Sequence, residues 1–168
     1  MNAPPSFPAP SAATTLAQAA ALVASGQHYP TGSLYVVATP IGNLADLSLR
    51  AIHVLSKVQH LACEDTRVAA QLLRHLGLTL PLLPLHAHNE REGAAAVLER
   101  LARGDSVAYV SDAGTPAVSD PGAHLVAAAQ AAAVRVVPIP GASSALAALS
   151  VAGDAVGRGF DFVGFLPA

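Results

Sequence analysis

SLYVVATP, residues 33–40, is an apolar run rich in β-branched side chains that ends at a Thr-Pro pair. A short run of this kind, closed by a turn, is typical of a strand that is buried on both faces. Similar runs recur along the chain, each followed by a turn and then by apolar residues at helical spacing. The pattern predicts five strands, over residues 33–38, 60–63, 82–85, 106–110 and 135–138.

The segments between these strands carry apolar residues three and four positions apart, which indicates amphipathic helices. Local signals mark several ends: Asp46 and Asp120 are typical N-caps, and Gly77 and Gly104 are typical of the residue that follows a helix. The predicted helices cover residues 46–58, 66–76, 94–101, 120–133 and 142–151. Because strands alternate with helices, we expect an α/β fold with a five-stranded, mostly parallel sheet and helices on both faces.

The composition changes along the chain and predicts three parts. Residues 1–31 are rich in Pro and Ala and are expected to form a flexible tail, although residues 14–24 show weak helical spacing. Residues 32–153 hold the α/β domain. Residues 154–168 combine a glycine-rich linker with three phenylalanines, which is typical of the first strand of a truncated second domain.

The overall composition excludes several classes of protein. With 52% hydrophobic and 12% charged residues, the chain is not a disordered, highly charged one. A net charge of −2 argues against a surface that tracks nucleic-acid phosphates. No apolar run reaches the ~18–20 residues that a membrane span needs. A secretory signal requires basic residues before its apolar stretch, and none precedes the first apolar stretch of this chain. The single cysteine, Cys63, forms no internal disulfide, so we expect a cytoplasmic protein.

The expected ligand site lies at the carboxyl ends of the strands, where ligands bind in open parallel sheets. The loops at these ends are rich in Gly, Pro and polar residues, over 39–43, 64–67, 86–90, 111–116 and 140–144. None contains a dinucleotide-binding glycine fingerprint, a P-loop or the nucleophile elbow of serine hydrolases. We therefore expect a ligand that is largely uncharged or cationic.

Two of these loops allow a second interpretation as ordinary local structure. The loop SDAGTP, residues 111–116, either brings the backbone close to a ligand at Gly114 or is a turn capped by Asp112. The hydroxyls of Ser143 and Ser144 either contact a ligand or cap the helix that follows.

Two groups of polar residues likewise allow more than one interpretation. Residues 64–67, EDTR, are candidates for acid–base work or for a helix cap. His86 and His88 are spaced for metal binding, but no third ligand is evident nearby, and we predict no metal site.

Five stretches together resemble one family. They are LYVVATPIGNLADLSLRA (34–51), ACEDTR (62–67), LHAHNE (85–90), YVSDAGTPAVSDPG (109–122) and PIPGASSALAAL (138–149). They are similar to the N-terminal domain of the small-subunit ribosomal RNA cytidine 2′-O-methyltransferases, a branch of the tetrapyrrole methylase family. The resemblance runs in order from about Gly32 to Ala168.

The resemblance implies a two-domain enzyme that transfers a methyl group from S-adenosylmethionine to a ribose 2′-hydroxyl of a cytidine in 16S ribosomal RNA. It further implies action on the 30S subunit in the cytoplasm, and a homodimer. The residues implied to border the cofactor are Pro40, Ile41, Gly42, Asp112, Ala113, Gly114, Thr115, Val118, Ser143 and Ser144. The acceptor side is assigned to polar residues at other strand ends: Glu64, Asp65 and Arg67 as catalytic candidates, and His86, His88 and Asn89 beside the substrate.

The chain departs from the family in two ways. Relatives carry a Gly-Asp-Pro cofactor loop where this chain has Gly114-Thr115-Pro116. The second domain is missing beyond its first residues, so we expect weak cofactor binding and no methylation of ribosomal subunits by these 168 residues alone. Two alternatives remain: a non-catalytic cofactor-binding or dimerisation module, and a tetrapyrrole methyltransferase.

Overall fold

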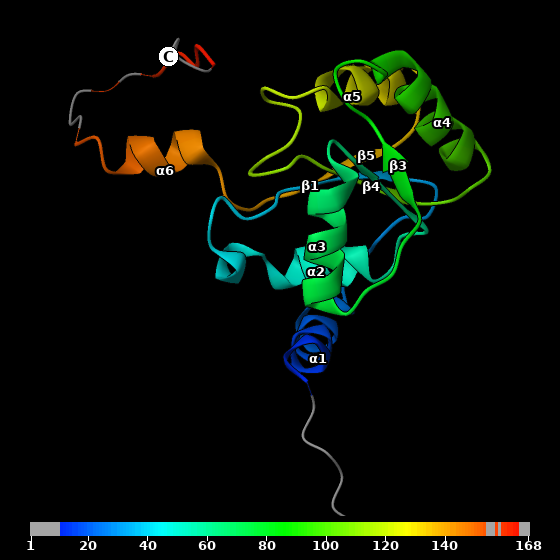
Figure 1. Cartoon of the computed structure of the whole chain (residues 1–168), viewed down its shortest axis with the longest axis horizontal. Helices are drawn as coiled ribbons and strands as arrows, with labels where there is room; N and C mark the ends of the chain where they lie inside the picture. Colours follow the sequence, from blue (N-terminus) through cyan, green and yellow to red (C-terminus); the bar gives the residue numbers. More distant parts are fainter. Residues whose placement is uncertain (1–10, 154–156, 158, 165–168) are drawn as a thin grey trace, which may run out of the picture.

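A computed structural model describes residues 11–153, 157 and 159–164. Within this part, a five-stranded sheet forms the centre of the molecule (Figure 1). Its strands are β1 (Leu34–Val37), β2 (His60–Cys63), β3 (Leu82–Pro84), β4 (Val107–Val110) and β5 (Val136–Ile139). They lie in the order β3-β2-β4-β1-β5, and every neighbouring pair is parallel. The predicted five-stranded sheet is confirmed.

Helices cover both faces of the sheet, as predicted, because alternate strand residues point to opposite sides. Tyr35 and Val37 of β1 join one core cluster, with α2 (Leu49–Leu55) and α3 (Thr66–Leu76). Leu34 of the same strand joins the other cluster, with α4 (Glu90–Ala102) and α5 (Gly122–Ala131). The result is a three-layer domain whose central strands β1, β2 and β4 are largely buried (Figure 1).

The helix ends differ from the predictions at several points. Residues Leu44–Asp46 form a short 3-10 helix (η1), and the N-cap of α2 is Ser48, whose hydroxyl accepts the N–H of Ala51 at 3.1 Å. The prediction of Asp46 as this cap was wrong, because a closer hydroxyl satisfies the free N–H groups. Gly77 ends α3 in the left-handed conformation, with φ of 66°, as predicted.

The predicted tail contains a helix, α1 (Ala12–Ala24), which corrects the expectation of a flexible segment over residues 1–31. Residues 1–10 lie outside the described residues. Ala20 and Ala24 are fully buried, and α1 packs on α2 and α3. The sequence of α1 predicts a helix only weakly, because its alanines give little difference in hydrophobicity between the two faces. The packing of its small buried side chains stabilises the helix.

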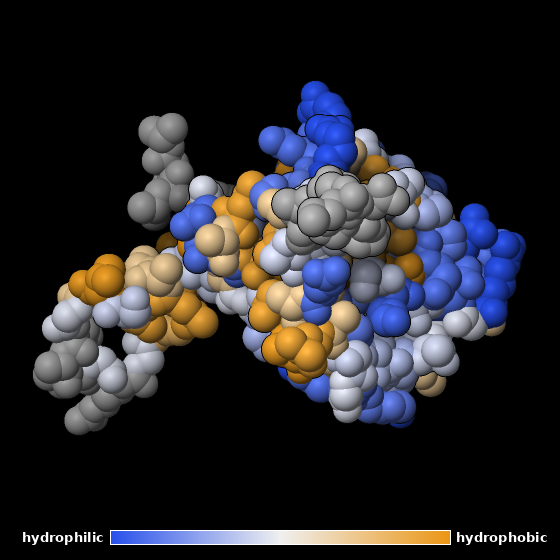
Figure 2. Space-filling model, turned by 90° about the horizontal axis from the view of Figure 1, so that it is seen from below, coloured by the Kyte–Doolittle hydropathy of each residue, from blue (hydrophilic) through white to orange (hydrophobic). Residues whose placement is uncertain are grey.

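The last helix, α6 (Ser144–Ser150), projects from the sheet and has no buried residue (Figure 1). Its apolar side chains lie on the surface, where Leu146 is 57% exposed, and Figure 2 shows apolar residues on this projection. The strand expected within residues 154–168 lies partly outside the described residues; positions 157 and 159–164 form no strand. In the part of the chain described here, no helix has the length and apolarity to cross a membrane.

Candidate functional site

The loops that follow β1, β4 and β5 are hydrogen-bonded to one another at the carboxyl edge of the sheet. The N–H of Thr39 donates to the carbonyl of Gly114 at 2.9 Å, and the N–H of Gly114 donates back at 3.2 Å. The hydroxyl of Thr115 donates to the carbonyl of Ala142 at 2.9 Å. Gly114 has φ of 84°, and a Cβ there would lie 3.3 Å from Ile41 Cγ2, so a larger residue would strain this contact. Loops distant in sequence thus form one surface.

The loop after β2 joins the same surface through Asp112. Its Oδ1 accepts the backbone N–H of Asp65 at 3.1 Å, and the hydroxyl of Thr39 donates to the carbonyl of Ser111 at 3.3 Å. These bonds cross from β2 to β4 and from β1 to β4, which are adjacent strand pairs. Ser111 and Asp112, directly after β4, therefore connect the loop that follows β1 with the loop that follows β2.

One cavity of about 480 Å³ opens on the α5 and α6 side of this surface. Seven of the ten residues predicted to border the cofactor line it: Asp112, Ala113, Gly114, Thr115, Val118, Ser143 and Ser144. Glu64, predicted for the acceptor side, lines it as well. We call it the first cavity.

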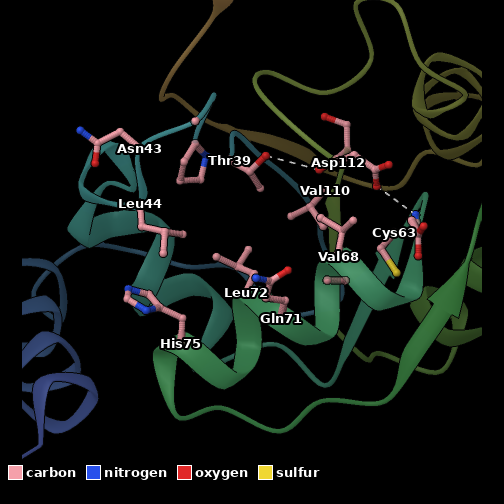
Figure 3. Close-up of a pocket in the computed structure, with 15 residues that line it drawn as sticks. Thr39, Asn43, Leu44, Cys63, Val68, Gln71, Leu72, His75, Val110 and Asp112 are labelled. Atoms are coloured by element: carbon pink, nitrogen blue, oxygen red, sulfur yellow. Dashed lines mark hydrogen bonds between the residues drawn. The ribbon is translucent and has the colours of Figure 1, made fainter.

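A second cavity, of about 340 Å³, opens on the α3 side and shares Ser111 and Asp112 with the first. It receives Pro40 and Gly42 from the first loop. Figure 3 shows its apolar wall and its polar rim. The wall includes Leu44, Val68 and Leu72, and the rim includes Asn43, Gln71 and His75. Pro40 and Gly42, two of the residues predicted to border the cofactor, therefore line the second cavity and not the first, and Ile41 between them lines neither.

Negative charge dominates both cavities. Glu64, Asp112 and Asp120 line the first, and Asp65 and Asp112 line the second. Among the described residues that line either cavity there is no Lys or Arg. Arg67 pairs with Asp65 at the second cavity, so it is the first cavity, with three carboxylates and no basic residue in its described lining, that repels a phosphate and fits a cation or a neutral polar group.

The two neighbouring carboxylates after β2 have opposite electrostatic environments. The Arg67 guanidinium donates to both oxygens of Asp65, and this pairing holds the pKa of Asp65 at about 2. Burial, reinforced by the negative charges of Asp112 and Asp120, raises the pKa of Glu64. Asp65 also accepts the N–H of Arg67 as the N-cap of α3. Asp65 is thus the N-cap of α3, and Glu64 is the carboxylate of the two that more readily binds a proton.

The segment after β3 lies beside this pair. Glu64, Asp65, Arg67 and His86 line one shallow surface. Asn89 is occupied in shaping the loop, since its Oδ1 accepts the N–H of His86 at 2.7 Å and its Nδ2 donates to the carbonyl of Pro84. The rings of His86 and His88 lie 6.0 Å apart. Within the described ranges, no group of three His, Cys, Asp or Glu residues is placed to hold a metal ion.

A sequence model of the tetrapyrrole (corrin/porphyrin) methylases matches residues 33–167, which is most of the chain. The chain belongs to this family.

Several curated relatives in the family share more than half of their aligned residues with the chain. "Ribosomal RNA small subunit methyltransferase I" of Xylella fastidiosa strain Temecula1 is 58% identical over 137 residues, covering 82% of this chain and 50% of the relative. The protein of the same name from Pseudomonas aeruginosa is 55% identical, covering 82% and 48%. The chain spans about half the length of these relatives.

The fold of the family is also found in solved structures. A uroporphyrin-III-C-methyltransferase from Thermus thermophilus superposes with a TM-score of 0.56 at 24% identity, covering 71% of this chain and 50% of the other. At this identity the likeness concerns the fold alone. It agrees with the three-layer domain described above.

In this methylase domain, several site residues also have local structural roles. The hydroxyl of Ser143 accepts the N–H of Leu146 at 3.4 Å, so it caps α6, one of its two predicted interpretations. Asp120, expected to cap the helix after it, does accept the N–H of Gly122 at 2.9 Å, but α5 begins at Gly122 and Pro121 occupies the N-cap position.

Sequence reasoning missed two groups of residues. The lining from α3 gave no signal, because helix surface residues such as Gln71 and His75 face a cavity only once η1 is placed opposite them. The hydrogen bonds that Asp120 accepts from the Tyr109 hydroxyl and from the Ala117 N–H were also not predicted. The sequence SDPG nevertheless placed Asp120 directly after the loop that follows β4.

Proposed function

We propose that this domain binds S-adenosylmethionine in the first cavity and is the N-terminal half of an enzyme that methylates a ribose 2′-hydroxyl of a cytidine in 16S ribosomal RNA. The observation that carries the proposal is the negatively charged first cavity, which is lined by the loops that follow β2, β4 and β5. The names of the relatives support ribosomal RNA as the acceptor.

The first cavity suits this cofactor in charge and shape. Glu64 and Asp112 favour a ligand that carries a sulfonium and an ammonium group. Gly114 contributes no side chain to the cavity wall, and the hydroxyls of Ser143 and Ser144 line the cavity, where they can donate to polar atoms of the ligand. Bound there, the cofactor supplies an activated methyl group, so the protein needs chiefly to align donor and acceptor.

We assign the role of proton acceptor to Glu64. A 2′-hydroxyl is a poor nucleophile, and a carboxylate with a raised pKa is suited to take its proton. Glu64 lines both the first cavity and the shallow surface that holds Arg67 and His86, so it stands between cofactor and acceptor. Arg67, whose side chain is 90% exposed, is placed to contact an RNA phosphate. His86 lines the same surface, and the ring of His88 lies 6.0 Å from the ring of His86.

The assembly that we propose is a homodimer that acts on the 30S subunit in the cytoplasm. Exposed apolar side chains on α6, Leu146 and Leu149, support a covering partner. Light scattering of the purified protein tests this point, and a single monomeric mass at micromolar concentration contradicts it.

Mass mapping of 16S ribosomal RNA from cells with and without this gene tests the reaction. We expect one ribose methyl group on a cytidine to disappear with the gene. It should return with the unsubstituted gene, and E64Q should restore it at least tenfold more slowly, whereas E99Q on the exposed face of α4 should restore it fully. Unchanged ribosomal RNA together with altered tetrapyrroles would favour the tetrapyrrole alternative.

Binding of the cofactor is tested separately on the 168-residue chain by calorimetry. We expect weak but measurable binding of S-adenosylmethionine, and no methyl transfer to 30S subunits by the chain alone. Dimerisation without any cofactor binding would favour the non-catalytic module instead.

A further inference from the structure

The carboxylate of Asp120 is the centre of a cluster that links the cofactor loop to the core. Its Oδ1 accepts the hydroxyl of Tyr109 at 2.7 Å and the N–H of Gly122 at 2.9 Å. Its Oδ2 accepts the N–H of Ala117 at 2.7 Å. A single side chain thus receives three hydrogen bonds, from β4, from the start of α5 and from the loop between them.

The partners on the core side are rigid. Tyr109 is fully buried in the middle layer, and burial raises the pKa of its hydroxyl, which stays protonated and donates. The ring passes under Gly122, where a Cβ would overlap it and would lie 2.7 Å from Asp120 Oδ1. The missing side chain at position 122 is therefore what allows Tyr109 to reach Asp120.

The partner on the loop side is strained. Ala117 has φ of 64°, in the left-handed region that alanine seldom adopts. It sits directly before Val118 and two positions after Thr115, both of which line the first cavity. The hydrogen bond from its N–H to Asp120 is the contact that opposes relaxation of this residue.

We propose that Asp120 is a positioning residue for the cofactor loop: through Ala117 it holds residues 113–118 in the conformation that shapes the first cavity. This inference rests on the proposed function for its ligand, and on the geometry of the three hydrogen bonds for its mechanism. Asp120 also lines the first cavity, but both of its oxygens accept hydrogen bonds from the protein, so we assign its effect on the ligand to the loop that it holds.

The substitution D120N separates the three bonds. The amide oxygen can still accept from Tyr109 and Gly122, but the amide NH₂ then faces the N–H of Ala117, and two donors repel. We expect the loop to relax, with about tenfold weaker binding of S-adenosylhomocysteine and about tenfold faster hydrogen exchange at the Gly114 amide, which pairs with Thr39. Exchange in β1 and β4 should stay unchanged.

A second substitution distinguishes geometry from charge, since D120N also removes a negative charge near the cavity. Glycine adopts φ of 64° without strain, so A117G in the D120N background should restore most of the affinity and the slow exchange at Gly114. The matched control is A133G, because Ala133 has φ of 56° at the far end of α5 and lines no part of the cavity. It should not restore either.

The outcomes decide the inference as follows. Rescue by A117G and none by A133G supports the positioning role. Unchanged exchange at Gly114 in D120N, loss of affinity without rescue, or faster exchange with full affinity each overturns it. If the unsubstituted chain binds no S-adenosylhomocysteine, the proposed function fails, and the exchange data alone then decide whether Asp120 sets the loop conformation.

Discussion

The backbone N–H of Asp65 donates a 3.1 Å hydrogen bond to Oδ1 of Asp112, which lies 47 residues further along the chain. The bond joins the loops of two adjacent strands, β2 and β4, and places the Asp112 carboxylate on the shared wall of both cavities. Two properties of Asp112 are therefore separable, its hydrogen bond and its charge.

The variant D112N keeps an oxygen for the Asp65 N–H but removes the charge. We expect it to weaken binding of the cationic S-adenosylmethionine about fivefold more than binding of S-adenosylhomocysteine, whose sulfur is neutral. Calorimetric titration of both ligands into the chain measures this ratio. D105N provides the control, since Asp105 pairs with His60 at the opposite end of β2. An equal loss for the two ligands contradicts the electrostatic role.

The variant E64Q should change how stability depends on pH. Because the pKa of folded Glu64 is raised above its ordinary value of 4.5, ionisation of this group opposes folding. This free-energy cost is absent below the pKa of Glu64 in the unfolded chain, and it grows as the pH rises from that value through the pKa of Glu64 in the folded chain. We therefore expect E64Q and the unsubstituted chain to have equal stability near pH 4 and E64Q to be the more stable at pH 7. Urea unfolding at both pH values measures this; greater stability of the unsubstituted chain at pH 7 contradicts it.

Cys63 should be unreactive in the folded protein. The residue is 1% exposed, and burial together with the charges of Asp112 and Asp65 raises the pKa of its thiol to about 11. Thiolate is the reactive form, so a thiol reagent at pH 8 should modify Cys63 only as fast as the domain unfolds. Addition of urea beyond the unfolding midpoint should make the reaction rapid. Rapid modification of the native protein is the contrary result.

Helix α1 should contribute to the stability of the domain through its buried alanines. The substitution A20E places a charge at a fully buried position facing α2 and α3, and we expect a loss of about 2–3 kcal/mol in the free energy of unfolding. L22E lies on the same helix at a site that is 85% exposed and should change stability by less than about 0.5 kcal/mol. Similar unfolding curves for the two variants would mean that α1 is not docked.

The stability of the domain should depend on the absence of a side chain at position 122. G122A forces a Cβ into the ring of Tyr109, and we expect about 3 kcal/mol of destabilisation. G26A is the matched change, because no atom lies within 4 Å of a Cβ there. Thermal unfolding of both variants gives the comparison, and a G122A variant as stable as G26A contradicts the packing described.

The order and type of the central elements followed from local patterns. The apolar runs around Tyr35 and Tyr109 predicted β1 and β4, because central strands of a βαβ sheet are buried on both faces. Gly77 predicted the end of α3. The strand ends likewise predicted where polar residues would gather. Helix α1 was indicated only by weak helical spacing over residues 14–24, because its alanines carry little amphipathic contrast, and its stability comes from contacts with α2 and α3.

The sequence by itself determined that the chain is an α/β domain of one family, since periodicity and loop motifs are properties of neighbouring residues. Only the tertiary structure decided which polar residues share a wall. The strand order places β4 between β1 and β2, and this neighbourhood brings Gly114 to Thr39 and Asp112 to Asp65. It also separated Asp65, whose charge is paired with Arg67, from Glu64, whose charge is not. The environment of Glu64 arises from burial and from the charges of Asp112 and Asp120, distant along the chain, which no local pattern contains, whereas Asp65 is paired with Arg67 only two residues away.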